Sequence, residues 1–241
     1  VSPEEAKGGR NWSNYTWHGD QAPGHPWVHG LQTSDCDFND LRSSKLIIMD
    51  GKNLVENKMA DSHWFIQCME RGAKLVTISP EYSPPATKSD YWLPIRPQTD
   101  AALFLGMTKI MIDNEWYDKE FVKTFTDFPL LVRTDNLQRL RAADIFPEYK
   151  NSLSPDGPSF KIQNLSREQY EKLGDFVIWD TKTKSFQAIT RDDVGSAMQK
   201  KGLDPAILGK FSVKIADKDV EVMPLFELYK SYHLKDYDID T

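Results

Sequence analysis

The chain has 241 residues, of which 39% are hydrophobic and 12% aromatic, enough for a packed core in one large or two small domains. Its formal net charge of -6 disfavours nucleic acid or an anionic membrane surface as the main partner, because both are polyanions. The sequence holds no apolar run near the roughly 20 residues that span a bilayer. Its two cysteines are too few for a disulfide framework.

The segment from Asn14 to Asp40 is expected to form a long ordered loop. Its prolines and glycines break regular structure, and its apolar residues follow neither helical nor strand periodicity. Loops of this length in compact domains are usually functional or disordered, and the density of tryptophan and tyrosine here argues against disorder. The sequence therefore predicts a functional site in this segment.

Four side chains of this loop could supply a metal site. His18, Asp20, His25 and His29 offer imidazole and carboxylate groups that could converge on one ion. Nothing here is helical, so their spacing fixes no ligand geometry. The alternative is that the histidines hydrogen-bond to the backbone and pack beside prolines and tryptophans. On the residues alone, both interpretations stay open.

The next stretch predicts a βαβ unit. Lys45 to Met49 is a short apolar run between turn signals, as expected for a buried strand. A helix should follow, capped by Asp61 and ended by a left-handed Gly72. Leu75 to Ile78 is the second predicted strand. The two strands should be parallel, with a right-handed crossover.

Ligands of open parallel sheets bind beyond the carboxyl ends of the strands, so residues 50–53 and 79–82 should face one crevice. Glu81 could accept hydrogen bonds from ribose hydroxyls or from a guanine N–H edge. The sequence lacks a G-x-G-x-x-G turn, and about eight residues are expected between Gly51 and the helix start, too many for the usual phosphate turn. An ordinary pair of loops remains the alternative.

A third strand and a strong helix are predicted next. Asp90 to Ile95 should be an edge strand because of its prolines. Thr99 and Asp100 should begin the helix and leave backbone N–H groups able to meet an anion. The expected apolar stripe of this helix comprises Ala102, Leu103, Gly106, Met107, Ile110 and Met111.

The remainder is predicted to be less regular. Residues 134–175 carry several prolines and turn signals, which indicate an irregular surface excursion. The other expected elements are a helix over 119–126, hairpins over 176–189 and 211–223, and a helix from 225 to 234. The predicted fold class is α/β, an open and mostly parallel sheet of nucleotide-binding type with peripheral β-hairpins.

One run of residues carries a family resemblance. Tyr15-Thr16-Trp17-His18-Gly19-Asp20, followed by Pro23 and Gln32-Thr33-Ser34-Asp35, resembles the catalytic subunit of the molybdenum oxidoreductases related to respiratory nitrate reductase, within the dimethyl sulfoxide reductase superfamily. The sequence motif HGDQAPGHPWVHG is more similar to nitrite oxidoreductase alpha subunits than to nitrate reductases. The resemblance covers residues 11 to about 133, and it implies a larger multidomain molybdoenzyme.

The resemblance implies roles for individual residues. Asp20 would be the protein ligand to molybdenum and, with His18, a catalytic residue, while His25 and His29 would orient substrate or support the site. The segment 96–102 would contact the guanosine part of the cofactor, and the family usually has glycine where Gln98 stands. The cofactor-binding set would be Gly19, Gly51, Asn53, Pro80, Glu81, Thr99 and Asp100.

The implied cofactor is molybdenum bis(molybdopterin guanine dinucleotide), with an iron–sulfur cluster in an amino-terminal part outside this sequence. The expected domains are a molybdenum-ligating loop over 1–44, an α/β layer binding the guanosine part over 45–133, and an irregular, hairpin-rich region over 134–241. The implied reaction is oxygen-atom transfer between water and a nitrogen oxyanion, with nitrite oxidation to nitrate preferred over reduction of nitrate or a chlorate-type oxyanion.

The resemblance also implies an iron–sulfur electron-transfer beta subunit and a haem gamma subunit as partners, with membrane association only through them. A small oxyanion would be the substrate, and no nucleic acid is expected. The expected location is periplasmic or at the membrane facing the periplasm, and the alternative is the cytoplasmic face. Two hypotheses about function from other classes of protein remain. One is a metal-free nucleotide-dependent α/β enzyme, and the other is a binding domain that uses the aromatic loop.

Overall fold

The computed structural model of the chain describes Val28, residues 37–152 and residues 175–235. The chain divides into two compact units, Val1–Asp100 and Ala101–Thr241. Each unit has hydrophobic clusters of its own. None of the helices in the described ranges is long and apolar enough to cross a membrane.

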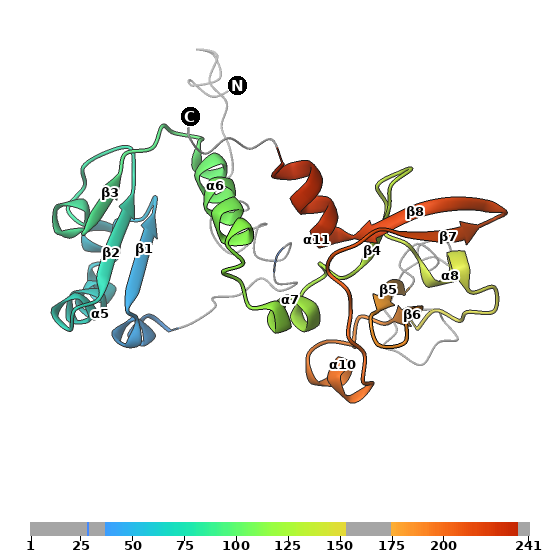
Figure 1. Cartoon of the computed structure of the whole chain (residues 1–241). Helices are drawn as coiled ribbons and strands as arrows, with labels where there is room; N and C mark the ends of the chain where they lie inside the picture. The colour runs from blue at the N-terminus through green and yellow to red at the C-terminus, as the bar shows by residue number, and fades with distance from the viewer. Residues whose placement is uncertain (1–27, 29–36, 153–174, 236–241) are drawn as a thin grey trace, which may run out of the picture. The chain divides into compact units, whose positions relative to one another are not determined.

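The first unit is built on a three-stranded parallel sheet. Its strands are β1 (Leu46–Asp50), β2 (Lys74–Ile78) and β3 (Tyr91–Leu93), in the order β1-β2-β3 (Figure 1). Both pairs are parallel, and Ile47 lies opposite Leu75. The predicted βαβ unit and the edge position of the third strand are therefore confirmed.

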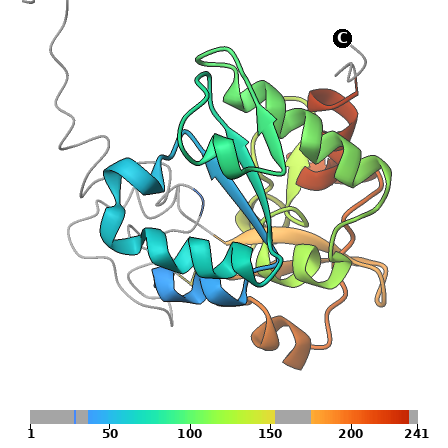
Figure 2. The same cartoon turned by 90° about the vertical axis from the view of Figure 1, so that its left-hand side faces the viewer.

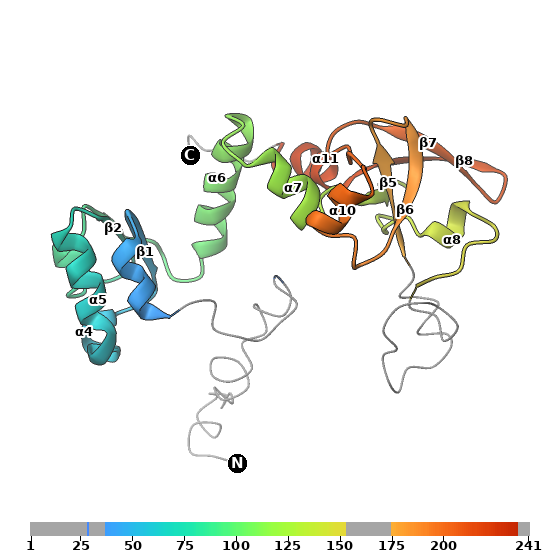
Figure 3. The same cartoon turned by 90° about the horizontal axis from the view of Figure 1, so that it is seen from below.

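One face of this sheet is covered by helical segments. These are η1 (Phe38–Ser43), α4 (Leu54–Asn57) and α5 (Met59–Glu70). Figure 2 shows η1 running alongside α5, and Figure 3 shows α4 and α5 next to β1. Phe65 and Cys68 of α5 are buried against the apolar side chains of β1 and β2.

The helix start differs from the expectation. The predicted helix is α5, which begins at Met59, so the expected gap of about eight residues after Gly51 is confirmed. The gap contains an unpredicted short helix, α4, which begins at Leu54 and is capped by the side chain of Asn53. Asp61 lies in the first turn of α5, whose N-cap is Lys58. The left-handed Gly72 after the helix is confirmed, with a φ of 96°.

The helix α6 (Asp100–Asp113) begins where the sequence predicts. Its predicted apolar stripe is only half-buried or exposed, and its one buried residue is Ile112. Ile112 and Leu105 belong to a cluster with Val122 of α7 (Lys119–Phe125) and Phe226. The packing face of α6 within this unit is therefore rotated away from the predicted stripe.

The second unit contains antiparallel strands. Figure 1 shows β8 between β4 and β7, with α11 at the end of β8. The pairing of β7 with β8 and of β5 with β6 confirms both predicted hairpins. The strands are β4 (Leu131–Arg133), β5 (Phe176–Asp180), β6 (Ser185–Ile189), β7 (Phe211–Ile215) and β8 (Lys218–Pro224). With the parallel sheet of the first unit, these strands confirm the α/β fold class with peripheral hairpins.

Short helices complete the second unit, and two of their features were not predicted. The five-residue α10 packs next to α7, as Figure 3 shows. The expected helix from Leu225 onward changes to a π-helix after its first turn. The helices are α8 (Ala142–Ile145), α10 (Ser196–Lys200), α11 (Leu225–Leu228) and the π-helix η3 (Tyr229–His233). The 3-10 turn η2 (Ala86–Lys88) belongs to the first unit.

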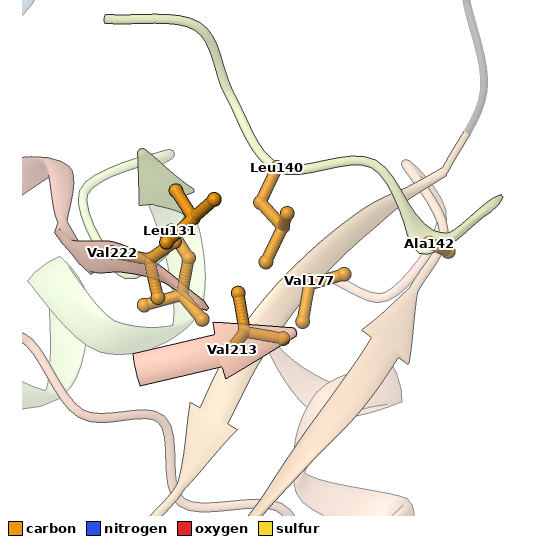
Figure 4. Close-up of a cluster of buried hydrophobic side chains, with 7 residues drawn as sticks. Leu131, Leu140, Ala142, Val177, Val213 and Val222 are labelled. Atoms are coloured by element: carbon orange, nitrogen blue, oxygen red, sulfur yellow. The ribbon is translucent and has the colours of Figure 1, made fainter. Parts of the chain in front are cut away.

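Buried aliphatic side chains hold the strands of the second unit together. Figure 4 shows side chains of β4, β5, β7 and β8 gathered around Leu140, with Ala142 at the start of α8 to one side. Leu131 of β4 and Val222 of β8 are fully buried. The labelled side chains are Leu131, Leu140, Ala142, Val177, Val213 and Val222.

A buried polar clasp joins two segments that are distant in sequence. The Asp175 carboxylate accepts hydrogen bonds from the Tyr149 hydroxyl at 2.8 Å and from the Ser152 backbone N–H and hydroxyl at 2.8 and 2.6 Å. Burial and then the hydrogen bond to Asp175 raise the pKa of Tyr149. The clasp therefore ties together the two residues that flank positions 153–174, which lie outside the described residues.

Replacing Leu131 by alanine should destabilise the second unit by about 2 to 5 kcal/mol, because a fully buried leucine would leave a cavity. The midpoint of its denaturant-induced unfolding would show the loss. Leu137→Ala is the matched control, since Leu137 is 66% exposed and its truncation leaves no cavity. Equal losses for both variants would contradict the packing described here.

Candidate functional site

The carboxyl ends of the three parallel strands are held at one edge of the sheet. The Gly51 N–H, just after β1, donates to the Ile78 carbonyl at 3.0 Å. The Ser79 N–H, just after β2, donates to the Leu93 carbonyl at 3.2 Å. The loops that follow the strands therefore leave from the same edge, which is where ligands of parallel sheets bind.

The loop after β1 turns sharply into α4. Gly51 has a φ of 56°, a left-handed conformation that favours glycine. The Asn53 side-chain oxygen accepts a hydrogen bond from the Glu56 N–H at 3.1 Å, and its amide group donates to the Glu56 carboxylate. The predicted site residue Asn53 thus uses its side chain to cap the helix.

Two carboxyl groups meet at this edge. Asp50 ends β1, and Asp100 begins α6. The pKa of Asp50 is raised, first by partial burial of its carboxyl and then by the charge of Asp100 and a hydrogen bond between the two carboxyl groups. The residue as a whole is exposed. A ligand that offers N–H or O–H donors to this pair would relieve the repulsion between the two acids.

The loop after β2 presents a third carboxylate. Glu81 is exposed, and its side chain forms no hydrogen bond or ion pair with the described residues. The loop itself is held, because the Trp92 indole N–H donates to the Ser79 carbonyl at 3.1 Å. The Tyr82 ring packs edge-on against Trp92, with 4.9 Å between ring centroids. Pro80 is exposed between these anchored residues.

The turn before α6 is tight. The Thr99 backbone N–H and hydroxyl both donate to the Arg96 carbonyl, at 3.1 and 2.7 Å. Gln98 has a φ of 71°, a conformation that costs a side chain other than glycine about 1 to 2 kcal/mol. This geometry explains physically why glycine suits the position that Gln98 occupies.

Several predicted site residues cannot be placed. Asp20, His18, Gly19, His25 and His29 lie outside the described residues. In the ranges that the structure does describe, no three histidine, cysteine or acidic side chains are grouped so that they could hold a metal ion. The metal-ligating role of Asp20 therefore stays a prediction.

The structure adds Asp50 to the predicted site. The sequence placed Asp50 in a loop facing the crevice but did not single out its carboxyl. The available signal was its position, the last residue of an apolar strand and directly before a left-handed glycine. Asp50 interacts with Asp100, and Glu81 follows the neighbouring strand β2, so these carboxylates suit a neutral or cationic group rich in hydrogen-bond donors.

The second unit has a cavity lined by arginines, and it is less suited to binding a charged ligand. It has a volume of 740 Å³, and its walls include Arg133, Arg139 and Arg141. Arg133 pairs with Asp135 at 2.7 Å, and Arg139 pairs with Asp127. The Arg141 guanidinium lies 4.5 Å from the centroid of the Phe176 ring. These ion pairs leave the cavity close to neutral.

The fold defines an α/β protein whose first unit is built on a parallel sheet. Residues 5–220 match the family model described as molybdopterin oxidoreductase. The chain therefore belongs to the molybdopterin oxidoreductase family, and the resemblance to molybdenum oxidoreductases related to nitrate reductase is confirmed.

Two curated relatives and one solved structure illustrate the relationship. The perchlorate reductase subunit alpha of Dechloromonas aromatica is 30% identical over 92% of this chain and 24% of its own length. The respiratory nitrate reductase subunit alpha of Haloferax mediterranei is 37% identical over 57% of this chain and 14% of its own. The acetylene hydratase of Pelobacter acetylenicus is 38% identical over 48% of this chain and 16% of its own, with a TM-score of 0.40. This chain thus spans about a quarter or less of these relatives.

Replacing Asp50 by asparagine should raise the melting temperature of the cofactor-free protein at pH 7. The pKa of the Asp50 carboxyl is raised above 3.8 on folding, so the folded state binds the proton more tightly than the unfolded state does. The stability of the fold therefore falls as the pH rises from about 3.8 through the folded-state pKa. The gain should stay below about 1 kcal/mol because the side chain is largely exposed. It should vanish near pH 3, where the carboxyl is protonated in both states.

Asp90→Asn is the matched control, since Asp90 lies just before β3 in the same unit. Hydrogen bonds from Lys74 and from the Leu75 N–H lower the pKa of Asp90. The Asp90 carboxylate stabilises the fold at neutral pH, and this contribution is lost as the pH falls through the folded-state pKa of Asp90. The Asp90→Asn variant should therefore have a lower melting temperature at pH 7. A lower melting temperature for Asp50→Asn would refute the carboxyl pair.

Proposed function

We propose that the chain is part of the catalytic alpha subunit of a molybdenum oxidoreductase that acts on a small oxyanion. The family match over residues 5–220 carries this proposal. The relatives named above act, by their names, as perchlorate and nitrate reductases. Because the chain spans 24% of the first and 14% of the second, the activity belongs to a whole subunit of which these residues form one part.

Within this class we favour oxidation of nitrite to nitrate. The sequence motif HGDQAPGHPWVHG of the loop resembles nitrite oxidoreductase alpha subunits, which supports the oxidation of nitrite. Reduction of nitrate or of a chlorate-type oxyanion is the second candidate, and the names of the relatives favour it. Turnover of nitrite with an electron acceptor, compared with turnover of nitrate, chlorate and perchlorate with a donor, distinguishes the two directions.

The cofactor we infer is molybdenum bis(molybdopterin guanine dinucleotide). When bound, it supplies oxygen-atom transfer coupled to a two-electron change at the metal. The described residues fit its nucleotide end, since Asp50, Glu81 and Asp100 offer carboxylate acceptors where ribose hydroxyls and a guanine N–H edge offer donors. The backbone at Gly51, Asn53, Pro80 and Thr99 would complete this end of the site.

The metal end of the site would belong to the loop before the first strand. Asp20 would hold the metal through a hard oxygen ligand, with Gly19 close to the cofactor. His18 would contact the substrate, and His25 and His29 would orient it or fix the ligand through hydrogen bonds. These assignments follow the family resemblance of the loop.

The partners we infer are an iron–sulfur beta subunit and a haem gamma subunit that carry the electrons. The relatives are themselves named as alpha subunits, which supports this arrangement. An iron–sulfur cluster elsewhere in the subunit would pass electrons from the metal. We place the enzyme in the periplasm or at the membrane facing it, with membrane contact through its partners, and the cytoplasmic face is the alternative.

Asp20→Ala in the full-length enzyme should abolish turnover and leave most of the pterin bound. Only the metal ligand would be lost, because the residues proposed for the nucleotide end lie far along the chain. Asp40→Ala is the control, since Asp40 is exposed on η1. Turnover and the released pterin and guanine nucleotide are measured on the same preparation. Rates like those of the unmodified enzyme would remove Asp20 from the metal site.

Glu81→Ala should lower cofactor occupancy more than it lowers the activity of molecules that keep the cofactor. Losing charge-assisted hydrogen bonds costs roughly 1.5 to 3 kcal/mol, which is about a tenfold change in occupancy or more. The measurement is activity per molybdenum atom, with the exposed Glu70 on α5 changed to alanine as the control. If activity per molybdenum falls as far as total activity, Glu81 acts at the metal instead.

A further inference from the structure

A second cavity of the second unit is lined mainly by lysines. Its volume is 690 Å³, and it lies between α6, the start of β7 and the π-helix η3. We call it the lysine cavity. Its lining residues are Lys109, Asp113, Lys210, Glu227, Lys230, Ser231, Tyr232 and Lys235. The cavity walls include no aliphatic residue and one aromatic residue, so an apolar small molecule is a poor fit.

The walls of the lysine cavity are rigidly held. Ile112 of α6, Phe226 of α11 and Leu234 after η3 are buried in one hydrophobic cluster. Each of these residues lies close in sequence to a lining residue, so the cluster fixes the spacing between the lysines of α6 and those of η3. The cavity is therefore a feature of the packed unit and not of a loose loop.

The charges of the lysine cavity are unbalanced. Of its two carboxylates, Asp113 pairs with Lys109 at 2.8 Å. Glu227 accepts a hydrogen bond from the neutral Ser231 hydroxyl at 2.7 Å and keeps its charge. Lys230 and Lys235 form no ion pair within the described residues. Lys230 lies near the charge of Glu115, and Lys210 has a long, exposed ion pair with Glu221 at 3.6 Å, for which a partner's carboxylate can compete. The lining itself holds four lysines and two carboxylates, on a chain whose formal net charge is -6.

The π-helix that carries part of the lining is an independent sign of function. The Leu234 N–H donates to the Tyr229 carbonyl at 3.2 Å, which is the wide spacing of a π-turn. Such turns are rare, pack their backbone less favourably than α-helices, and are frequently found at functional sites. Here the π-turn presents Lys230, Ser231 and Tyr232 to the cavity.

We propose that the lysine cavity is the docking site for an acidic segment of a protein partner, with side-chain carboxylates of that segment bound by Lys230, Lys235 and Lys210. Several ammonium groups spread over three structural elements suit several carboxylates along a peptide, whereas one compact anion would engage few of them. Lysines are flexible point charges and favour fast, salt-dependent association over fixed bidentate recognition. This inference goes beyond the proposed function and does not depend on which oxyanion is the substrate.

The test uses the full-length subunit and a fluorescein-labelled hexaglutamate peptide, with binding followed by anisotropy. We expect binding at about 50 mM salt that weakens strongly at about 300 mM salt, because the contacts are between exposed charges. The charge-reversed pair Lys230→Glu and Lys235→Glu should bind at least about tenfold more weakly. The pair Lys230→Arg and Lys235→Arg, which keeps the charge, should stay within about twofold of the unmodified protein.

The matched control reverses Lys214 and Lys218, two exposed lysines of the β7–β8 hairpin in the same unit. This pair changes the net charge equally and should leave peptide binding within about twofold. Equal losses in both pairs would show attraction to net charge alone and would overturn the proposal. Full displacement of the peptide by about 1 mM inorganic phosphate, but not by chloride of equal ionic strength, would show a compact-anion site and would overturn it too.

Circular dichroism and melting temperature establish that each variant is folded. If the charge-reversed pair does not fold, Lys230→Gln and Lys235→Gln take its place, with Lys214→Gln and Lys218→Gln as their control. Peptide affinity unchanged in the folded glutamine pair would overturn the proposal, and a selective loss would support it. Because neither lysine belongs to the proposed cofactor site, turnover with a small electron donor or acceptor should stay unchanged.

Discussion

The alignment of three parallel strands at one edge is the constraint on which the candidate site depends. The hydrogen bonds from Gly51 to Ile78 and from Ser79 to Leu93 bring the strand ends level, so the loops that follow must start together. The same alignment places the Asp50 carboxyl beside that of Asp100, where repulsion and partial burial work against folding. A ligand with hydrogen-bond donors would relieve this repulsion, which is consistent with the proposed nucleotide end of the site.

The first unit was largely predictable because its signals are local. The continuous apolar runs of β1 and β2, the left-handed Gly72 and the start of α6 at Asp100 each depend on a few neighbouring residues. The helix α4 was not foreseen, since four residues are too short to show helical periodicity and its cap is an ordinary-looking Asn53. That omission mattered for the candidate site, because the side chain of Asn53 is engaged in capping α4.

The second unit shows where prediction from sequence ends. Its hairpins follow from alternating strands around turns, but the clasp of Asp175 with Tyr149 and Ser152 joins residues separated by a long excursion, and no local pattern reports such a contact. The packing face of α6 was mispredicted for the same reason, since its apolar residues spread round the helix and only the partner elements select Ile112. The loop with Asp20, predicted to ligate the metal, gave the strongest family signal of all, yet that signal comes from the sequence motif and carries no geometry.

Electrostatics differ between the two surfaces that the structure singles out. The strand edge of the first unit presents carboxylates, which suit the hydroxyl and N–H donors of the proposed nucleotide. The lysine cavity of the second unit concentrates positive charge on a chain that is otherwise acidic. An acidic protein approaching this surface is repelled by most of it and attracted at one place, so the cavity selects the orientation of the encounter before any short-range contact forms.

Orientation matters most for partners that exchange electrons, because transfer requires a defined approach of two redox centres while release must remain fast. A few exposed lysines on a rigid wall meet both demands, since their attraction acts over about 8 to 10 Å at physiological salt and adds little to the lifetime of the complex.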